Sequence, residues 1–249
     1  MRRGLVLLSW CCATLLSACS STDDSPRAPS VSPHQARRYV PYPDSGALSF
    51  KTPGITPYAQ QLIDVATGEW TYFGRQLTGK YNRAGHKEDE RGYRERVIRY
   101  WREGTGRTVT DTVNIGWSGA FIAYVMKLAG TGRDWVYSGS HGGYIRMAIE
   151  NRKNGNRKAP FVGFRLDEYA AKPGDLVCAR LERNVTYDRY PADFAAHCDI
   201  VVAIKQRELH VIGGNLTDSV SMRFVDIDDR GHVIDNMRTG WFVVIQNRK

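Results

Sequence analysis

The spacing of the hydrophobic residues changes near the middle of this chain, and this change constrains the fold more than any other feature. From residue 58 to about residue 149, apolar residues recur at helical spacing, and Thr56 followed by Pro57 is a typical helix start. From residue 174 onwards, the apolar residues alternate with polar ones or form short runs, which is typical of strands. Helices followed by strands predict an α+β domain.

The two patterns also predict individual elements. We expect four helices, over residues 56–77, 93–101 and 117–129 and from a cap at Ser140 to about residue 149. Five segments are predicted as strands: GDLVCAR, AHCDIVVAI, ELHVIGG, SVSMRFVDI and GWFVVIQN. Because turn-like linkers such as KQR, NLTD and DDRGH connect several of them, we expect N-terminal helices packed on a five-stranded antiparallel sheet.

The first residues indicate export. Arg2 and Arg3 precede an apolar run over residues 5–16, which is shorter than the roughly 20 residues that span a bilayer. The run therefore predicts a signal peptide over residues 1–18. The following Leu-Ser-Ala-Cys at residues 16–19 resembles the bacterial lipobox, which implies that lipid is attached to Cys19 and anchors the mature chain to a membrane.

The residues after Cys19 predict a tether and a location. Residues 19–54 are rich in Ser, Pro, Asp and Arg and have no hydrophobic period, so we expect a flexible tether that leaves residues 55–249 as the folded domain. Ser20 follows the cysteine, and the resemblance to enteric lipoproteins implies anchoring in the outer membrane, facing the periplasm.

The chain is strongly basic. Its net charge is +9, and +7 once Arg2 and Arg3 are removed with the signal peptide. Such a surplus favours an anionic partner, such as peptidoglycan or another envelope polymer, although a solvated surface explains it equally well. The basic side chains of the loop at residues 152–158 are open to the same two interpretations. Export argues against nucleic acid as a partner.

Cysteine use gives little evidence for a metal. After export only Cys178 and Cys198 are left besides Cys19, and they are either a disulfide or two buried thiols. No C-x-x-C spacing appears, so a zinc site is not expected. The sequence also carries no phosphate loop and no dinucleotide-binding glycines, and we predict no cofactor.

Three polar residues stand where chemistry is plausible. Ser118 begins a predicted helix, whose first turn offers unpaired N–H groups that can stabilise an oxyanion. His197 begins an apolar strand and is suited to act as a general base. Asn215 follows the glycines 213 and 214 and could hydrogen-bond the imidazole; Asp218 is a rival for that role, although a turn is its commoner use.

The order of these motifs resembles a known superfamily. WSGAFI at residues 117–122, then GDLVC, HCDIVV and GGN, is similar to the CHAP and NlpC-type amidohydrolases, which share a papain-like fold and cleave amide bonds in cell-wall peptides. The chain resembles still more an uncharacterised bacterial domain-of-unknown-function family at the edge of this superfamily. The resemblance covers roughly residues 56–247.

This resemblance implies roles for individual residues. Ser118 stands in the place of the catalytic cysteine, His197 in that of the base and Asn215 in that of the orienting residue. Trp117, His141 and Glu69 lie in matching motifs and are expected to contact substrate. From the residues alone, His141 is as well explained by a helix cap or a surface position, and Glu69 by an exposed helix carboxylate.

The serine leaves two functions open. A cysteine can be held as a thiolate beside an imidazolium, whereas a serine must lose its proton to a base during attack. One hypothesis is therefore a peptidoglycan peptide or amide hydrolase that uses a Ser118–His197 pair. The alternative is a catalytically inactive lipoprotein that binds or scaffolds the cell wall. Acyl transfer is a third option that nothing in the sequence favours over hydrolysis.

Overall fold

The computed structural model describes residue 50 and residues 53–235 and 238–249, all within one compact unit that spans Ala36–Lys249. The predicted signal peptide, Cys19 and nearly all of the predicted tether lie outside the described residues, so the domain boundaries, the lipid anchor and the membrane location remain predictions. Within the described part of the chain, no helix is long and apolar enough to cross a membrane.

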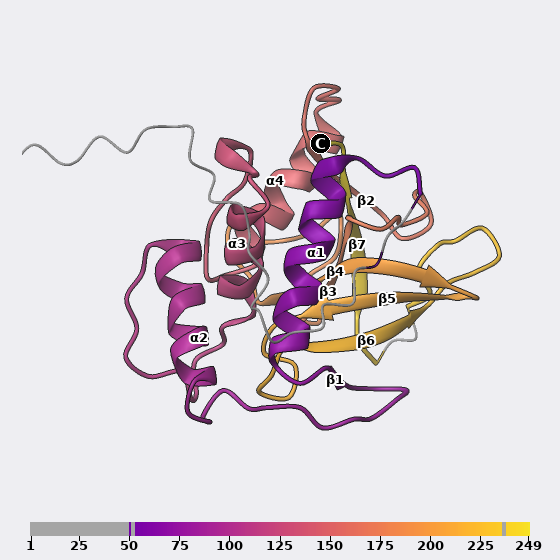
Figure 1. Ribbon diagram of the computed structural model, residues 1–249. Helices are drawn as coiled ribbons and strands as arrows, with labels where there is room; N and C mark the ends of the chain where they lie inside the picture. Colours follow the sequence, from indigo (N-terminus) through magenta and orange to yellow (C-terminus); the bar gives the residue numbers. More distant parts are fainter. Residues whose placement is uncertain (1–49, 51–52, 236–237) are drawn as a thin grey trace, which may run out of the picture. The chain divides into compact units, whose positions relative to one another are not determined.

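Helices occupy the first half of the described chain (Figure 1). Helix α1 spans Pro57–Tyr72, α2 spans Tyr93–Arg99, α3 spans Ser118–Leu128 and α4 spans Gly142–Lys153. A π-helical segment, Tyr100–Thr105, continues α2, and a 3-10 turn covers Gly132–Asp134. Helix α1 begins as predicted, because the Thr56 hydroxyl accepts a hydrogen bond from the Ala59 N–H at 3.1 Å.

Helix α1 is shorter than the sequence predicted. The helical pattern continues to Leu77, but the chain leaves the helix after Tyr72 because Gly74 and Arg75 adopt left-handed backbone conformations with φ of 79° and 62°. A left-handed residue cannot continue a right-handed helix. The freed residues Gln76 and Leu77 then form the short strand β1.

The sheet has seven strands in the order β1-β6-β5-β4-β3-β7-β2. The strands are β1 Gln76–Leu77, β2 Phe161–Phe164, β3 Leu176–Arg180, β4 Ala196–Lys205, β5 Glu208–Gly213, β6 Ser221–Asp226 and β7 Trp241–Asn247. All neighbours pair antiparallel except β1 and β6, which are parallel.

The prediction of a five-stranded antiparallel sheet is therefore wrong, although the α+β class is confirmed. The five predicted segments are present as β3 to β7, and the error lies in the two strands at the edges. Strand β1 has two residues and β2 has four, which is too short for a period of two to be recognised. The papain-like arrangement that the resemblance implied is not confirmed by this seven-stranded mixed sheet.

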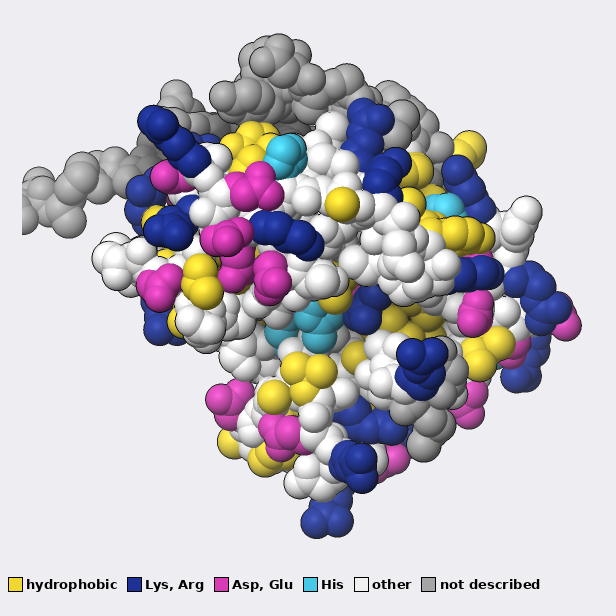
Figure 2. Space-filling view, turned by 90° about the horizontal axis from the view of Figure 1, so that it is seen from below, with side chains coloured by type: hydrophobic (Ala, Val, Ile, Leu, Met, Phe, Trp, Pro, Cys, Tyr) yellow, Lys and Arg dark blue, Asp and Glu magenta, His cyan; other side chains and the backbone are white. Residues whose placement is uncertain are grey.

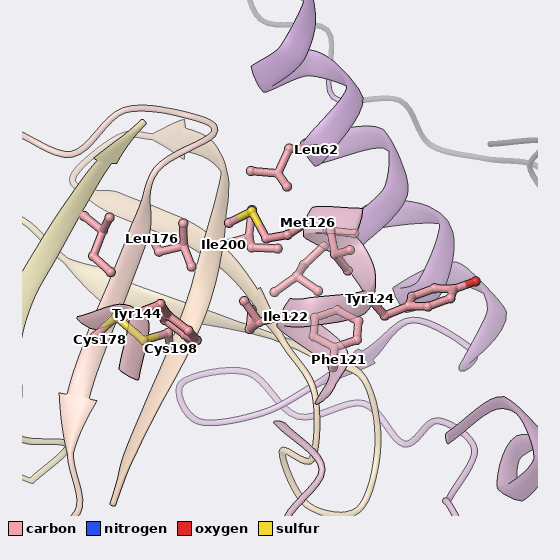
Figure 3. Packing of buried hydrophobic residues seen from close by; sticks show 14 of the residues in the cluster. Leu62, Phe121, Ile122, Tyr124, Met126, Tyr144, Leu176, Cys178, Cys198 and Ile200 are labelled. Carbon is pink, nitrogen blue, oxygen red and sulfur yellow. A yellow bond between two sulfur atoms is a disulfide. The ribbon is translucent and has the colours of Figure 1, made fainter. Parts of the chain in front are cut away.

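Both faces of the sheet are buried. Helices α1, α3 and α4 cover one face, where Phe121 and Ile122 from α3 belong to the same buried cluster as Leu176 and Ile200 from the sheet (Figure 3). On the other face Val201, Val211 and Trp241 pack with residues from irregular segments such as Tyr169 and Val233. Burial on both sides explains why the central strands are almost continuously apolar.

The two remaining cysteines form a disulfide. Cys178 on β3 and Cys198 on β4 lie directly opposite each other in the antiparallel register, with their Cα atoms 4.1 Å apart. Both side chains are fully buried within the core between the helices and the sheet (Figure 3). Of the two interpretations that the sequence left open, the structure has the disulfide.

Candidate functional site

Ser118 is the first residue of helix α3 and is half-buried. The helix start lies close against the segment before α4, because a Cβ atom on Gly119 would lie 2.2 Å from the carbonyl oxygen of Gly139. Only a glycine permits this approach of two backbones. The approach brings the start of α4, and with it His141, to the hydroxyl of Ser118.

The imidazole that meets Ser118 belongs to His141. The Ser118 Oγ lies 2.7 Å from the His141 Nε2, within hydrogen-bond distance. His141 is the N-cap residue of α4 and is only 3% exposed. Its other ring nitrogen, Nδ1, is hydrogen-bonded to the hydroxyl of Tyr144 one helical turn later. The sequence had assigned the role of base to His197 and a substrate contact to His141.

His197 holds a different set of partners. Its Nε2 lies 2.9 Å from the Oδ1 of Asp199, and the Arg223 Nε donates to Asp199 Oδ2 at 2.5 Å. The Asp199 side chain is fully buried. Gly213 leaves room for this carboxylate, since a Cβ atom there would lie 1.9 Å from Asp199 Oδ1. We name these three side chains the His197–Asp199–Arg223 row.

The two histidines are neighbours. The ring centroids of His141 and His197 are 5.4 Å apart, with an angle of 37° between the ring planes. The Ser118–His141 pair and the His197–Asp199–Arg223 row therefore adjoin, although they come from different elements. Figure 2 shows histidine side chains gathered in a hollow on the face seen from below, with basic side chains beside them.

Burial and charge set the protonation states of the site. Burial, followed by the electrostatic interaction with the neighbouring His197, holds the pKa of His141 well below its usual value, so the His141 ring is neutral at pH 7. Burial alone would raise the pKa of Asp199, but the electrostatic interactions and hydrogen bonds with Arg223 and His197 outweigh it and lower that pKa to about 2. Burial raises the pKa of Tyr144 well above its usual value, and the charge of Asp199 adds to the effect.

Asn215 lines a cavity next to the segment that precedes helix α3, and no hydrogen bond of its side chain to Ser118, His141 or His197 is seen among the described residues. It sits after β5 in a left-handed conformation with φ of 55° and lines a cavity of about 480 Å³. Gly116, two residues before Ser118, and Asp218 line the same cavity. The groups that orient the imidazoles are instead Tyr144 for His141 and Asp199 for His197.

Comparison with known proteins identifies the family. Residues 74–247 match the family described as "Uncharacterized protein conserved in bacteria" (DUF2272). The chain belongs to DUF2272. The prediction of an uncharacterised bacterial family is thereby confirmed, whereas a relationship to the CHAP and NlpC-type enzymes is not shown. No curated protein and no solved structure matches the chain.

Most of the site lies within the DUF2272 region. Ser118, His141 and the His197–Asp199–Arg223 row fall between residues 74 and 247, as does Asn215, whereas Glu69 lies before the matched segment. The Glu69 carboxylate is fully buried, where Arg96 donates to both of its oxygens and the Tyr100 hydroxyl donates at 2.6 Å. A substrate would reach Glu69 only if this ion pair opened.

Trp117 is also enclosed by the DUF2272 domain. Its side chain is fully buried, its indole N–H donates to the Glu88 carboxylate, and its ring stacks against Phe73. Trp117 thus fixes the start of α3, next to Ser118. Both Trp117 and Glu69 are fully buried, so neither side chain offers an exposed polar atom for the predicted contact with substrate.

Sequence reasoning missed three side chains of the candidate site: Tyr144, Asp199 and Arg223. Asp199 follows His197 at a spacing of two, which places both side chains on one face of a strand. Tyr144 follows His141 at a spacing of three, which places both on one face of a helix. These two spacings could have identified Asp199 and Tyr144 as partners of the histidines from the sequence alone. Arg223 carries no local signal, since it reaches Asp199 from strand β6.

The candidate site brings together the Ser118 hydroxyl, the neutral imidazole of His141 and the start of helix α3. If Tyr144 accepts a hydrogen bond from His141 Nδ1–H, then Nε2 is the acceptor for the Ser118 proton. The first turn of α3 supplies N–H groups that have no partner within the helix. Among the described residues, no group of three or more His, Cys, Asp or Glu side chains is arranged to hold a metal ion.

Proposed function

We propose that this DUF2272 protein is a lipid-anchored envelope hydrolase that cleaves a peptide or amide bond of cell-wall peptides, with Ser118 as nucleophile and His141 as its base. The observation that carries the proposal is the 2.7 Å contact between Ser118 Oγ and His141 Nε2 at the start of a buried helix. A nucleophile within hydrogen-bond reach of a base that is itself oriented by a third group is the arrangement that activates a serine.

The reaction proceeds in two stages. Ser118 Oγ attacks the carbonyl carbon, its proton moves to His141 Nε2, and the carbonyl oxygen takes up the negative charge. The N–H groups of the first turn of α3, which have no partner within the helix, are available to stabilise this charge. The imidazolium then gives its proton to the leaving amine as the C–N bond breaks. Water hydrolyses the resulting ester by the reverse sequence of proton transfers, which restores Ser118.

The substrate class is supported by the sequence rather than by the geometry. The segment WSGAFI and the motifs after it resemble those of enzymes that cut cell-wall peptides, and the signal peptide with Cys19 would place the domain beside that polymer. The net charge of +7 after export favours a polymer that carries acidic groups, as peptidoglycan does.

A second candidate function is binding of the cell wall without cleavage, and one observation favours it. The same burial that keeps His141 neutral makes its protonated form costly, and attack by Ser118 requires that form. In this alternative, the neighbouring His197 and the first turn of α3 hold a peptide that Ser118 does not attack.

Purified full-length lipidated protein, incubated with sacculi in detergent, distinguishes the two functions. Hydrolysis predicts soluble peptide fragments in the mass spectrum, and Ser118→Ala should stop their release while Thr110→Ala, a hydroxyl deletion at an exposed residue outside the site, leaves it unchanged. A serine-reactive fluorophosphonate should label the wild-type protein only at Ser118. Co-sedimentation with sacculi without any fragments would favour binding alone, and unchanged release by Ser118→Ala would exclude Ser118 as the nucleophile.

A further inference from the structure

A second cavity, of about 250 Å³, is lined by three arginines. Arg152 lies at the end of helix α4, Arg157 lies in the basic loop after it, and Arg248 follows strand β7. Among the described residues, no acidic side chain lines this cavity, and none of the three arginines forms an ion pair. Three positive charges therefore share a small space without a countercharge from the protein.

These arginines present hydrogen-bond donors that no other described group uses. The Arg152 guanidinium lies over the ring of Phe164, 4.8 Å from the ring centroid, and this contact engages its face rather than its N–H groups. Arg248 donates from Nε to Gln246 Oε1 at 2.7 Å, which leaves its two Nη atoms available. Arg157 donates to no described residue. All three arginines are exposed, so an anion in solvent can reach these donors.

Hydrogen bonds hold the wall of the cavity in place. The Asn151 Nδ2 atom donates to the carbonyl of Phe161 on β2 at 3.0 Å, and the Asn156 N–H donates to the Asn151 carbonyl at 2.9 Å. The Arg248 N–H donates to the Pro160 carbonyl at 2.9 Å. The loop after α4 is thereby tied to β2 and to the end of β7, which fixes the backbone from which the arginines extend. A fixed backbone lowers the entropic cost of binding.

The cavity lies at the end of the domain that the predicted tether joins. The Thr56 hydroxyl, just before helix α1, donates to the carbonyl of Lys249, the residue after Arg248. Figure 1 likewise shows the C-terminus beside the start of α1. In the proposed function a lipid on Cys19 attaches the tether, residues 19–54, to a membrane. The chain that comes from the membrane would therefore enter the domain close to the arginines.

We infer that the three arginines bind the phosphate group of an anionic lipid headgroup and so hold the domain against the membrane. The planar N–H fork of an arginine matches the oxygens of a phosphate. A phosphomonoester dianion is favoured over a carboxylate, because three positive charges without a countercharge attract the higher charge more strongly. The choice of a lipid as the source of the phosphate rests on the anchor in the proposed function. The inference does not depend on whether Ser118 reacts.

Co-sedimentation with vesicles tests the inference. The protein is the chain from residue 19 with Cys19→Ser, which carries neither lipid nor signal peptide and contains the whole compact unit of residues 36–249. Vesicles of phosphatidylcholine with phosphatidic acid should bind it at least about tenfold more tightly than vesicles of phosphatidylcholine with oleate at the same surface charge, since only the former offer a phosphate. Ser118→Ala in the same chain should bind unchanged, which separates this result from the proposed hydrolysis.

Arg157→Gln and Arg248→Gln should each weaken binding to the phosphatidic acid vesicles by about tenfold, because each removes charge-assisted hydrogen bonds. Both residues are exposed, so the variants should keep the circular dichroism spectrum of the wild type. Arg183→Gln is the matched control, since Arg183 is an exposed cation outside the cavity and its loss changes the net charge equally. It should bind like wild type.

Two results would overturn the inference. Equal binding to the two kinds of vesicle, or an equal loss of binding in Arg157→Gln and Arg183→Gln, would make the net charge of the protein the cause of binding. Calorimetric binding of inorganic phosphate without selective binding of phosphatidic acid vesicles would assign the cavity to a soluble phosphate instead of a lipid.

Discussion

At the scale of single residues, the protonation state of His141 decides whether Ser118 can be activated. Burial lowers the pKa of His141, so the neutral ring that accepts a proton persists below pH 6.5, where an exposed histidine would be charged. For the proposed hydrolase, kcat/KM should therefore stay constant from pH 8 down past 6.5 and fall only at lower pH. A pH–rate profile measures this, and an acid limb centred at or above 6.5 would contradict His141 as the base.

The His197–Asp199–Arg223 row depends most directly on Gly213. An alanine Cβ at this position would lie 1.9 Å from Asp199 Oδ1 and 3.0 Å from His197 Nε2. We expect Gly213→Ala to destabilise the fold by about 1–3 kcal/mol, because overpacking forces the buried carboxylate to move. Urea unfolding gives this value. Gly116→Ala is the control, since a Cβ atom on Gly116 meets nothing within 4 Å; equal stability of the two variants would contradict the expected clash.

At the scale of helices and strands, the close approach of α3 and α4 explains which histidine meets Ser118. The elements themselves follow from the sequence: Ser118 begins α3, His141 caps α4 one residue after the predicted cap at Ser140, and His197 is the second residue of β4. Which of the two imidazoles lies against the hydroxyl depends on Gly119 meeting Gly139 across 20 residues of chain. No local pattern encodes such a contact, so the pairing of Ser118 with His141 was not predictable from spacing.

The edge strands β1 and β2 were not predicted because they too depend on contacts between residues that are far apart in the sequence. Strand β1 consists of Gln76 and Leu77, which continue the apolar pattern of the preceding helix and become a strand only because they pair with Ser221 and Met222. Strand β2 contains Gly163, which the helix α4 backbone approaches closely. Pairing with a distant partner, rather than intrinsic propensity, defines both strands.

The disulfide between β3 and β4 makes a prediction at this scale. It closes a loop with a sequence separation of 20, for which chain entropy predicts a stabilisation of about 3 kcal/mol. Replacing Cys178 and Cys198 together by alanine should lower the free energy of unfolding by about that amount, plus the lost packing of two buried sulfur atoms. The urea midpoint of oxidised wild type and the double variant measures it. A midpoint that does not fall would contradict a stabilising role.

At the scale of the whole molecule, the buried ion pair of Asp199 and Arg223 makes the stability of the fold depend on pH in the acid range. The pKa of Asp199 is about 2 in the folded protein and near 4 in an unfolded chain, so the pair stabilises the fold fully above pH 4. This contribution, about 2 kcal/mol, is lost as pH falls from about 4 to 2. The free energy of unfolding of Asp199→Asn should lack this decrease relative to wild type. Parallel pH curves for the two proteins would exclude Asp199 as a source of acid lability.

The proposed attachment of the whole protein to a membrane would have one of two physical causes, and one experiment separates them. A lipid on Cys19 would hold the chain whatever the salt concentration, whereas a mature net charge of +7 would hold it to anionic lipid only at low salt, because ions screen exposed charges. Cys19→Ser should therefore move the protein from the membrane fraction to the soluble fraction after a wash with about 1 M salt, where the screening length is near 3 Å. Cys12→Ser is the matched control, because Cys12 lies inside the predicted signal peptide and would be removed with it. If the wild-type and Cys12→Ser proteins stay on the membrane after the salt wash and only Cys19→Ser is released, the anchor is the lipid on Cys19. If salt also releases the wild-type protein, electrostatic attraction holds it to the membrane and the lipid anchor has no support.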